Sequence, residues 1–195
     1  MVITPRLTPL KPNCWSAPGR SLPGFLLLCV ILIPVSICHG APVDEIRLGV
    51  LYHDLGVWGG SSNEGGVDIN AELVFSPSLD LFNGTLRPNL GFSLNTTGDT
   101  SKIYGGALWE YRWIKGYFID LAVGLAAHNG ETDEGDVANM NQLGSPLLFR
   151  LAIETGYAFG GHHLISIMFD HISNGYLTEP NEGLDTLGLR YGYRF

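Results

Sequence analysis

Apolar and polar residues alternate along most of the chain after its first forty positions. In the last stretch, apolar side chains occupy every second position from 187 to 195, and small or charged residues stand between them. A period of two is the repeat of a β-strand, because successive side chains of a strand point to opposite faces. One face of this predicted strand is therefore apolar, and the other is polar.

Eight segments of this kind, each of roughly ten residues, follow one another and are separated by turn-forming residues. No segment after the first forty residues is long and apolar enough for a membrane-spanning helix. The pattern predicts an all-β protein with one domain at residues 41–195. We place the strands at 45–55, 67–76, 86–96, 102–113, 116–127, 146–157, 163–173 and 184–195.

The polar face of these segments carries charges of both signs. A soluble β-sandwich also alternates, but one water-exposed face has no need of so many charges, whereas they can cross-link the interior of a small closed barrel. Eight strands leave an interior just wide enough for side chains to fill, so we expect no lumen for transport. The charged residues are Arg47, Arg87, Arg112, Arg150, Arg190 and Arg194 with Asp68, Glu72, Glu110, Asp120, Glu154 and Asp170.

Aromatic residues gather at segment ends, around positions 109–117 and 191–195. Such clusters are typical of the girdles that membrane barrels place at the boundary between lipid and water. The longest connections, near 56–66, 128–145 and 174–183, alternate with short ones. This is the arrangement of outer loops and periplasmic turns in outer-membrane barrels. The sequence therefore predicts an eight-stranded antiparallel transmembrane β-barrel.

The first forty residues have the composition of a secretory signal peptide. They contain three cationic and no acidic residues, then an apolar run from 25 to 37 that closes on small residues. We expect residues 1–40 to be removed, which takes the formal net charge from −8 to −11. All cysteines lie in this segment, so the remaining chain has none for disulfides or thiolate metal sites. The acidic balance argues against nucleic-acid binding, and we expect no metal and no cofactor.

Candidate chemistry lies near the end of the chain. Alternation places His171 and Ser173 on the apolar face of their segment, two positions apart. A serine hydroxyl becomes a useful nucleophile when a base takes its proton and a third group orients that base. Asp185, at the head of the next segment, has the parity of that segment's apolar residues, so it points to the same side. Glu179 and Glu182 are the alternative carboxylates.

The same stretch carries a family resemblance. The run His-Ile-Ser-Asn at 171–174 is followed by Pro-Asn-Glu-Gly at 180–183, an acid at 185 and a strand that ends in an aromatic residue. This pattern resembles the PagL family of outer-membrane lipid A 3-O-deacylases, also called acyloxyacyl hydrolases. The motif covers about the last quarter of the chain, and the eight-strand layout extends the resemblance over residues 41–195.

Residue by residue, the resemblance places the family's catalytic histidine at His171, its nucleophilic serine at Ser173 and the asparagine that follows at Asn174. The family's best-known member has glutamate as the acid of the triad, whereas this chain has Asp185, one methylene shorter. The backbone amide of Asn174 and the turn residue Gly175 are candidates for stabilising the oxyanion.

The resemblance implies hydrolysis of the acyl ester at position 3 of lipid A, in the outer leaflet of a Gram-negative outer membrane. Lipid A or lipopolysaccharide would be the substrate, outer-membrane lipids would surround the barrel, and a homodimer is left open. A non-enzymatic barrel for adhesion or membrane integrity is the alternative, although such a protein has no reason to expose a polar pair on its lipid face. An acyltransferase barrel would need a cavity for a donor lipid, against which the charged interior argues.

Overall fold

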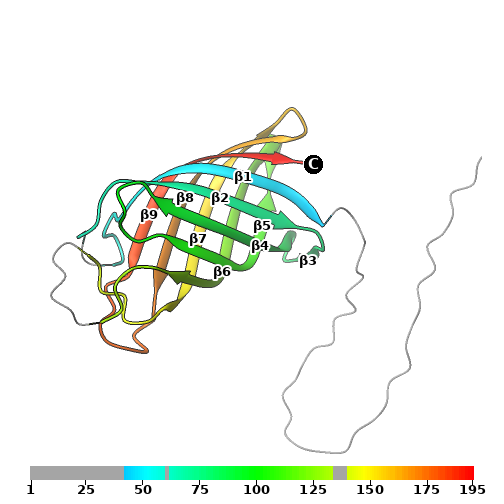
Figure 1. Cartoon of the computed structure of the whole chain (residues 1–195). Helices are drawn as coiled ribbons and strands as arrows, with labels where there is room; N and C mark the ends of the chain where they lie inside the picture. Colours follow the sequence, from blue (N-terminus) through cyan, green and yellow to red (C-terminus); the bar gives the residue numbers. More distant parts are fainter. Residues whose placement is uncertain (1–41, 60–61, 134–139) are drawn as a thin grey trace, which may run out of the picture. The chain divides into compact units, whose positions relative to one another are not determined.

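The computed structural model describes residues 42–59, 62–133 and 140–195, and the predicted signal peptide at 1–40 lies outside these ranges. The described residues form one antiparallel sheet (Figure 1). A single 3-10 turn, η1 (Ile114–Gly116), connects β5 to β6. The strands are β1 (Val43–Tyr52), β2 (Val67–Phe75), β3 (Leu79–Leu81), β4 (Gly84–Asn95), β5 (Lys102–Arg112), β6 (Tyr117–His128), β7 (Leu147–Phe159), β8 (His163–Ser173) and β9 (Leu184–Arg194).

The sheet closes on itself. The last strand, β9, pairs with β1, and β2 pairs with β4, so eight long strands form a continuous barrel. The prediction of an eight-stranded antiparallel barrel is confirmed. The three-residue β3 was not predicted and extends one end of the sheet as a hairpin with β4. β1 begins two residues before its predicted start and ends three residues before its predicted end, because the chain leaves the sheet after Tyr52, and Asp54 adopts a positive φ of 53°.

The two ends of the barrel differ. At the terminal end, where β1 begins and β9 ends, the connections between strands are short, apart from the β3 hairpin. At the loop end, the long connections after β1, β6 and β8 gather on one side of Figure 1, opposite the C-terminus. The alternation of long and short connections agrees with the sequence prediction.

The outer surface is apolar between the two ends. Near the terminal end, six aromatic rings from Trp109 to Phe159 follow one another with centroids 5.0 to 6.4 Å apart. None of the helices in the described ranges has both the length and the apolar character needed to cross a membrane. The exposed residues of the apolar belt include Leu48, Val50, Ile69, Phe92, Ile103, Leu121, Val123, Leu151, Ile153, Ile165, Ile167 and Leu189.

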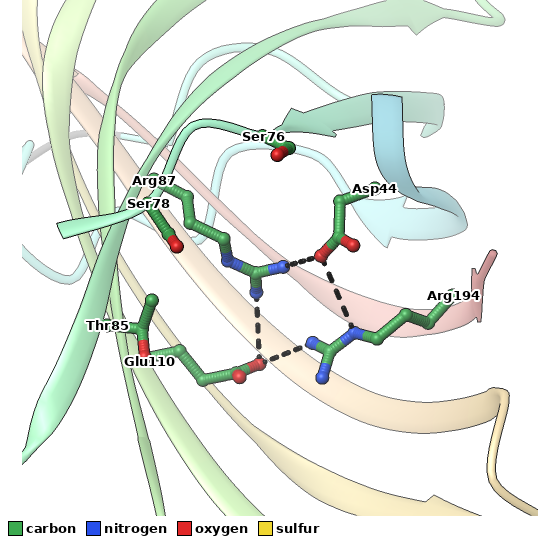
Figure 2. A pocket seen from close by; sticks show the side chains of 7 residues that line it. All are labelled: Asp44, Ser76, Ser78, Thr85, Arg87, Glu110 and Arg194. Atoms are coloured by element: carbon green, nitrogen blue, oxygen red, sulfur yellow. Dashed lines mark hydrogen bonds and ion pairs between the residues drawn. The ribbon is translucent and has the colours of Figure 1, made fainter. Parts of the chain in front are cut away.

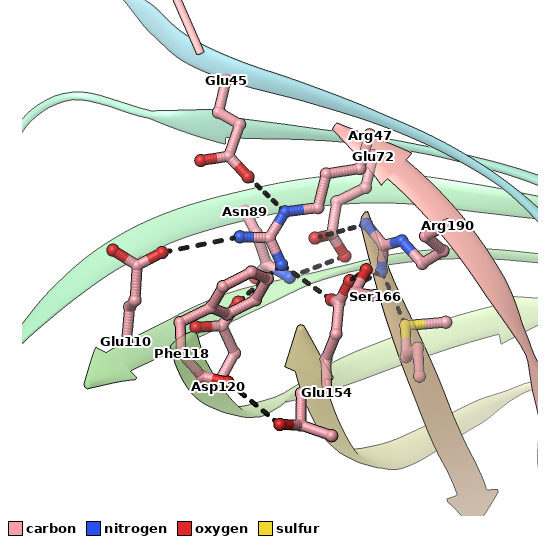
Figure 3. A network of polar contacts seen from close by, with 12 residues as sticks. Glu45, Arg47, Glu72, Asn89, Glu110, Phe118, Asp120, Glu154, Ser166 and Arg190 are labelled. Carbon is pink, nitrogen blue, oxygen red and sulfur yellow. Dashed lines mark hydrogen bonds and ion pairs between the residues drawn. The ribbon is translucent and has the colours of Figure 1, made fainter. Parts of the chain in front are cut away.

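Charged side chains fill the interior, and Arg47 is at their centre (Figure 3). Its Nη1 lies 2.6 Å from Asp120 Oδ2 and 2.7 Å from Glu154 Oε2, and its Nε donates to Glu45. All four side chains are buried, so each charge depends on its partners to replace lost hydration. As predicted, the interior charges cross-link strands that are far apart in the sequence.

Further along the barrel axis, a second set of ion pairs continues this packing. Asp170 forms ion pairs with Arg150 Nε and Lys102 Nζ, each at 2.7 Å. The Arg150 guanidinium lies 3.8 Å from the centroid of the Tyr104 ring. An apolar cluster then fills the loop end of the interior. It consists of Tyr104, Ala126, Leu143, Leu148, Ile172 and Leu184.

The terminal end of the interior opens into a small polar cavity of about 170 Å³ (Figure 2). Arg87 bridges Asp44 at 2.6 Å and Glu110 at 3.2 Å, and Arg194 contacts the same Glu110 at 2.9 Å. Both cations that line the cavity are therefore already paired with carboxylates.

Candidate active site

The candidate residues come from two neighbouring strands at the loop end of the barrel. His171 and Ser173 are the last outward-facing positions of β8, and Asp185 is the second residue of β9. The antiparallel register sets Asp185 directly opposite His171. Opposed residues share a face of the sheet, so the side chains of all three meet on the outer side of the barrel. The sequence-based prediction that they share a face is confirmed by the register.

The three side chains form a continuous chain of hydrogen bonds. His171 Nδ1 lies 2.6 Å from Asp185 Oδ1, and His171 Nε2 lies 3.0 Å from Ser173 Oγ. With the imidazole proton on Nδ1, the ring donates to the carboxylate and its Nε2 is free to accept the serine proton. This is the order of groups that activates a serine nucleophile.

Asp185 occupies the carboxylate position that the sequence left open among three acids. Its side chain is fully buried. Glu182, by contrast, accepts a hydrogen bond from the backbone of Gln142 at 2.7 Å, and Glu179 lies exposed in the loop. The shorter aspartate therefore reaches the imidazole without help from either glutamate.

The site is covered, which the sequence did not predict. His171 and Asp185 point outward, but His171 is only 9% exposed and Asp185 is not exposed at all. The segment 56–59, in the loop after β1, lies over them: the backbone N–H groups of Trp58 and Gly59 donate to Asp185 Oδ2 at 2.5 and 3.1 Å. The Trp58 ring stands edge-on to the His171 ring, with centroids 5.3 Å apart. His171 and Asp185 therefore face outward, but the segment 56–59 lies between them and the surroundings.

Asn174 fixes the loop that follows the serine. Its backbone N–H donates to Asn181 Oδ1 at 2.9 Å, and its Nδ2 lies 2.8 to 3.1 Å from three backbone carbonyls. The backbone amide of Asn174, one of the two candidates for stabilising the oxyanion, is thus engaged within the loop. Gly175, exposed with a positive φ of 66°, donates no backbone hydrogen bond to the described residues.

A buried histidine joins the loops beside the site. His53 Nδ1 lies 2.8 Å from Asp68 and its Nε2 lies 2.9 Å from Glu64. Glu64 in turn accepts from Thr100 Oγ1 at 2.8 Å and from the Asn141 backbone at 2.9 Å. Burial by itself lowers the pKa of His53, but the hydrogen bonds and negative charges of the two acids outweigh it and raise the pKa to about 9. His53 is therefore cationic at neutral pH.

The described ranges contain no group of three or more histidine, cysteine or acidic side chains arranged to hold a metal ion. The hydrogen-bonded order of Asp185, His171 and Ser173 suits proton transfer and nucleophilic attack.

The chain is similar to proteins of one known family. Residues 43–194 match the family model of lipid A 3-O-deacylase (PagL). A lipid A deacylase PagL of Bordetella bronchiseptica is 29% identical over 98 residues, which are 46% of this chain and 52% of that protein. The corresponding protein of Pseudomonas aeruginosa is 35% identical over 74 residues, 38% of this chain and 40% of that protein. The matched region thus spans about half or less of these relatives.

The fold is also found in a solved relative. The crystal structure of the outer membrane enzyme PagL aligns with a TM-score of 0.55 at 22% identity, over 76% of this chain and 99% of that one. At this identity, the similarity supports the barrel fold. Because the family model extends over all the strands, the chain belongs to the lipid A 3-O-deacylase (PagL) family and is an outer-membrane β-barrel.

Proposed function

We propose that this protein is a lipid A 3-O-deacylase, a serine esterase that hydrolyses the acyl ester at position 3 of lipid A. The observation that carries the proposal is the hydrogen-bonded chain from Asp185 through His171 to Ser173. Two curated relatives are named lipid A deacylases, which supports the same substrate. The reaction needs no metal or cofactor.

In the first step, Ser173 Oγ attacks the ester carbonyl while His171 Nε2 accepts the hydroxyl proton. The negative charge of Asp185 stabilises the imidazolium that forms and keeps the ring in the required orientation. When the tetrahedral intermediate collapses, the bond to the sugar oxygen breaks, and His171 gives its proton to that oxygen. The sugar leaves with a free hydroxyl, and the acyl group stays on Ser173.

In the second step, water releases the acyl group. His171 takes a proton from the water as it attacks the acyl-enzyme, and returns a proton to Ser173 Oγ as the fatty acid departs. Each tetrahedral intermediate carries an oxyanion that needs a hydrogen-bond donor. With Asn174 engaged in its loop, we assign this role to the backbone amide of Gly175.

The position of the site suits a membrane lipid. The serine lies on the outer wall, opposite the lipid-facing Phe149 in the β7–β8 ladder. In the adjoining loop, Tyr176 and Leu177 are 80% and 75% exposed. An ester at the level of the acyl chains can therefore reach Ser173 without leaving the outer leaflet. We propose that the loop end faces outward, toward the lipopolysaccharide.

The test is to express the full chain in a Gram-negative host and to analyse lipid A by mass spectrometry, beside a Ser173→Ala variant. Ser78→Ala is the matched control, since Ser78 is an exposed serine at the opposite end of the barrel. We expect loss of one hydroxyacyl chain with the parent and the control but not with Ser173→Ala.

Other results would overturn the proposal. If lipid A is unaltered in all strains although the barrel is folded in the membrane, the protein is not a deacylase for that substrate, and a non-enzymatic barrel becomes the better reading. If Ser173→Ala retains the activity, the nucleophile is wrongly assigned. A gain of acyl mass would indicate acyl transfer instead of hydrolysis.

A further inference from the structure

Asp185 is a buried carboxylate on the lipid side of the sheet. A charge in such a place is stable only when hydrogen bonds replace its hydration. His171 supplies one partner, at Oδ1, and the other two come from the backbone of residues 58 and 59, at Oδ2. Backbone donors hold a carboxylate in place without the loss of side-chain freedom that a charged partner would bring.

The Trp58 ring contacts His171, the hydrogen-bond partner of Asp185. It stands edge-on to His171 at 5.3 Å and edge-on to Phe169 at 5.4 Å, with interplanar angles of 79° and 83°. Its other side remains open, since the residue is 62% exposed. The ring therefore lies as a wall between the imidazole and the surroundings, and it limits rotation of the imidazole.

Two glycines allow the loops to come this close. A Cβ on Gly59 would lie 2.6 Å from the Glu182 carbonyl oxygen, and a Cβ on Gly183 would lie 3.1 Å from His171 Cε1. The first distance is too short for any side chain, so a larger residue at position 59 must push the loop away from Asp185. Gly65, in the same connection, has open space around it.

We propose that Trp58 and Gly59 are the positioning residues of the active site: their backbone amides fix the Asp185 carboxylate, and the Trp58 ring fixes the His171 imidazole. The inference rests on the proposed function, because it concerns the activation of Ser173. It predicts that displacing this segment slows the chemical step without weakening the binding of the substrate or probe that Ser173 attacks.

The experiment uses the full chain, folded in detergent micelles, and an alkyl fluorophosphonate that labels activated serines. Labelling rates at several probe concentrations separate the maximal rate from the half-saturating concentration, and melting of the folded barrel reports stability. Gly59→Ala tests the backbone contacts, with Gly65→Ala as its control. Trp58→Ala tests the ring, with Trp58→Phe as the variant that keeps an aromatic edge.

We expect Gly59→Ala and Trp58→Ala to lower the maximal labelling rate about 10- to 100-fold, with the half-saturating concentration and the melting temperature close to those of the controls. Trp58→Phe should recover most of the rate. Equal rates in Gly59→Ala and Gly65→Ala overturn the inference while leaving the proposed nucleophile intact, and so does a loss that follows the melting temperature. Absence of labelling at Ser173 in the parent overturns both proposals.

Discussion

Asp185 accepts hydrogen bonds from opposite sides: its Oδ1 faces the His171 ring at 2.6 Å, and its Oδ2 faces the two backbone N–H groups of the covering loop. An ionised carboxylate can serve both sides because both of its oxygens are acceptors. No neutral side chain of the same shape has this property, and the consequence can be tested by substitution.

Asp185→Asn should leave the barrel folded but reduce ester hydrolysis by about 10³- to 10⁴-fold. The backbone donors require an oxygen at the Oδ2 position, so the amide NH₂ must face His171 Nδ1. The ring then carries its proton on Nε2 and cannot accept one from Ser173. Turnover of purified lipid A in micelles measures the loss, and an active variant would show that Asp185 does not orient the imidazole.

Asp185→Glu should also impair the proposed reaction, although it keeps a carboxylate at this position. The fully buried side chain already has partners at 3.1 Å or less on both sides, so an added methylene must displace either the imidazole or the covering loop. We expect a rate at least about 10-fold below that of the parent. A rate equal to or above the parent's would mean that the loop adapts freely.

The buried cation at His53 makes the stability of the loop end depend on pH. Its folded pKa of about 9 lies above the ordinary value of 6.5, so its contribution is fully present below pH 6.5 and is lost as the pH rises through 9. The shift corresponds to at most about 3 kcal/mol. Unfolding by urea in detergent, followed from pH 6 to pH 10, should show this decline.

The control for the pH effect is His53→Gln, which keeps a polar side chain and removes the titrating ring. We expect this variant to be less stable than the parent at pH 6 and to show a flatter profile up to pH 10. If the decline of the parent persists unchanged in the variant, the titrating group lies elsewhere.

Arg47→Met should destabilise the barrel more than any exposed charge substitution. The change leaves Asp120 and Glu154 buried with less compensation, which typically costs about 3–5 kcal/mol. Arg112→Met is the control, because Arg112 pairs with Glu110 at 2.7 Å but is 36% exposed, and exposed pairs contribute about 1 kcal/mol or less. Comparable unfolding free energies for the two variants would contradict the interpretation of Arg47 as the centre of the interior.

The strands, and the side of the sheet on which each side chain lies, could be predicted from the sequence. Both follow from a local period of two. The register then brings His171 and Asp185 together without further information. Each strand was placed within about three residues of its observed bounds. The three-residue β3 was missed, since three residues are too few to show alternation.

The covering loop could not be predicted in this way. Trp58 and Asp185 are 127 positions apart, and the segment 56–59 has neither periodicity nor a motif. The contacts are made by backbone amides, which every residue type except proline has. The side chains in this segment therefore do not indicate that these contacts form. Gly59 is the one residue of this segment whose type is required by the contact. Its role becomes visible only in the structure, where the Glu182 carbonyl leaves no room for a Cβ.

The seam between the first and last strands also joins the two parts of the proposed active site. Trp58 follows β1, while His171 and Asp185 belong to β8 and β9, and the pairing of β1 with β9 brings the two parts side by side. An unfolded chain contains every residue of the site, but these residues are not yet in contact. Under the proposed function, the complete site therefore requires the closed barrel, because its positioning loop and its catalytic side chains come from opposite ends of the chain.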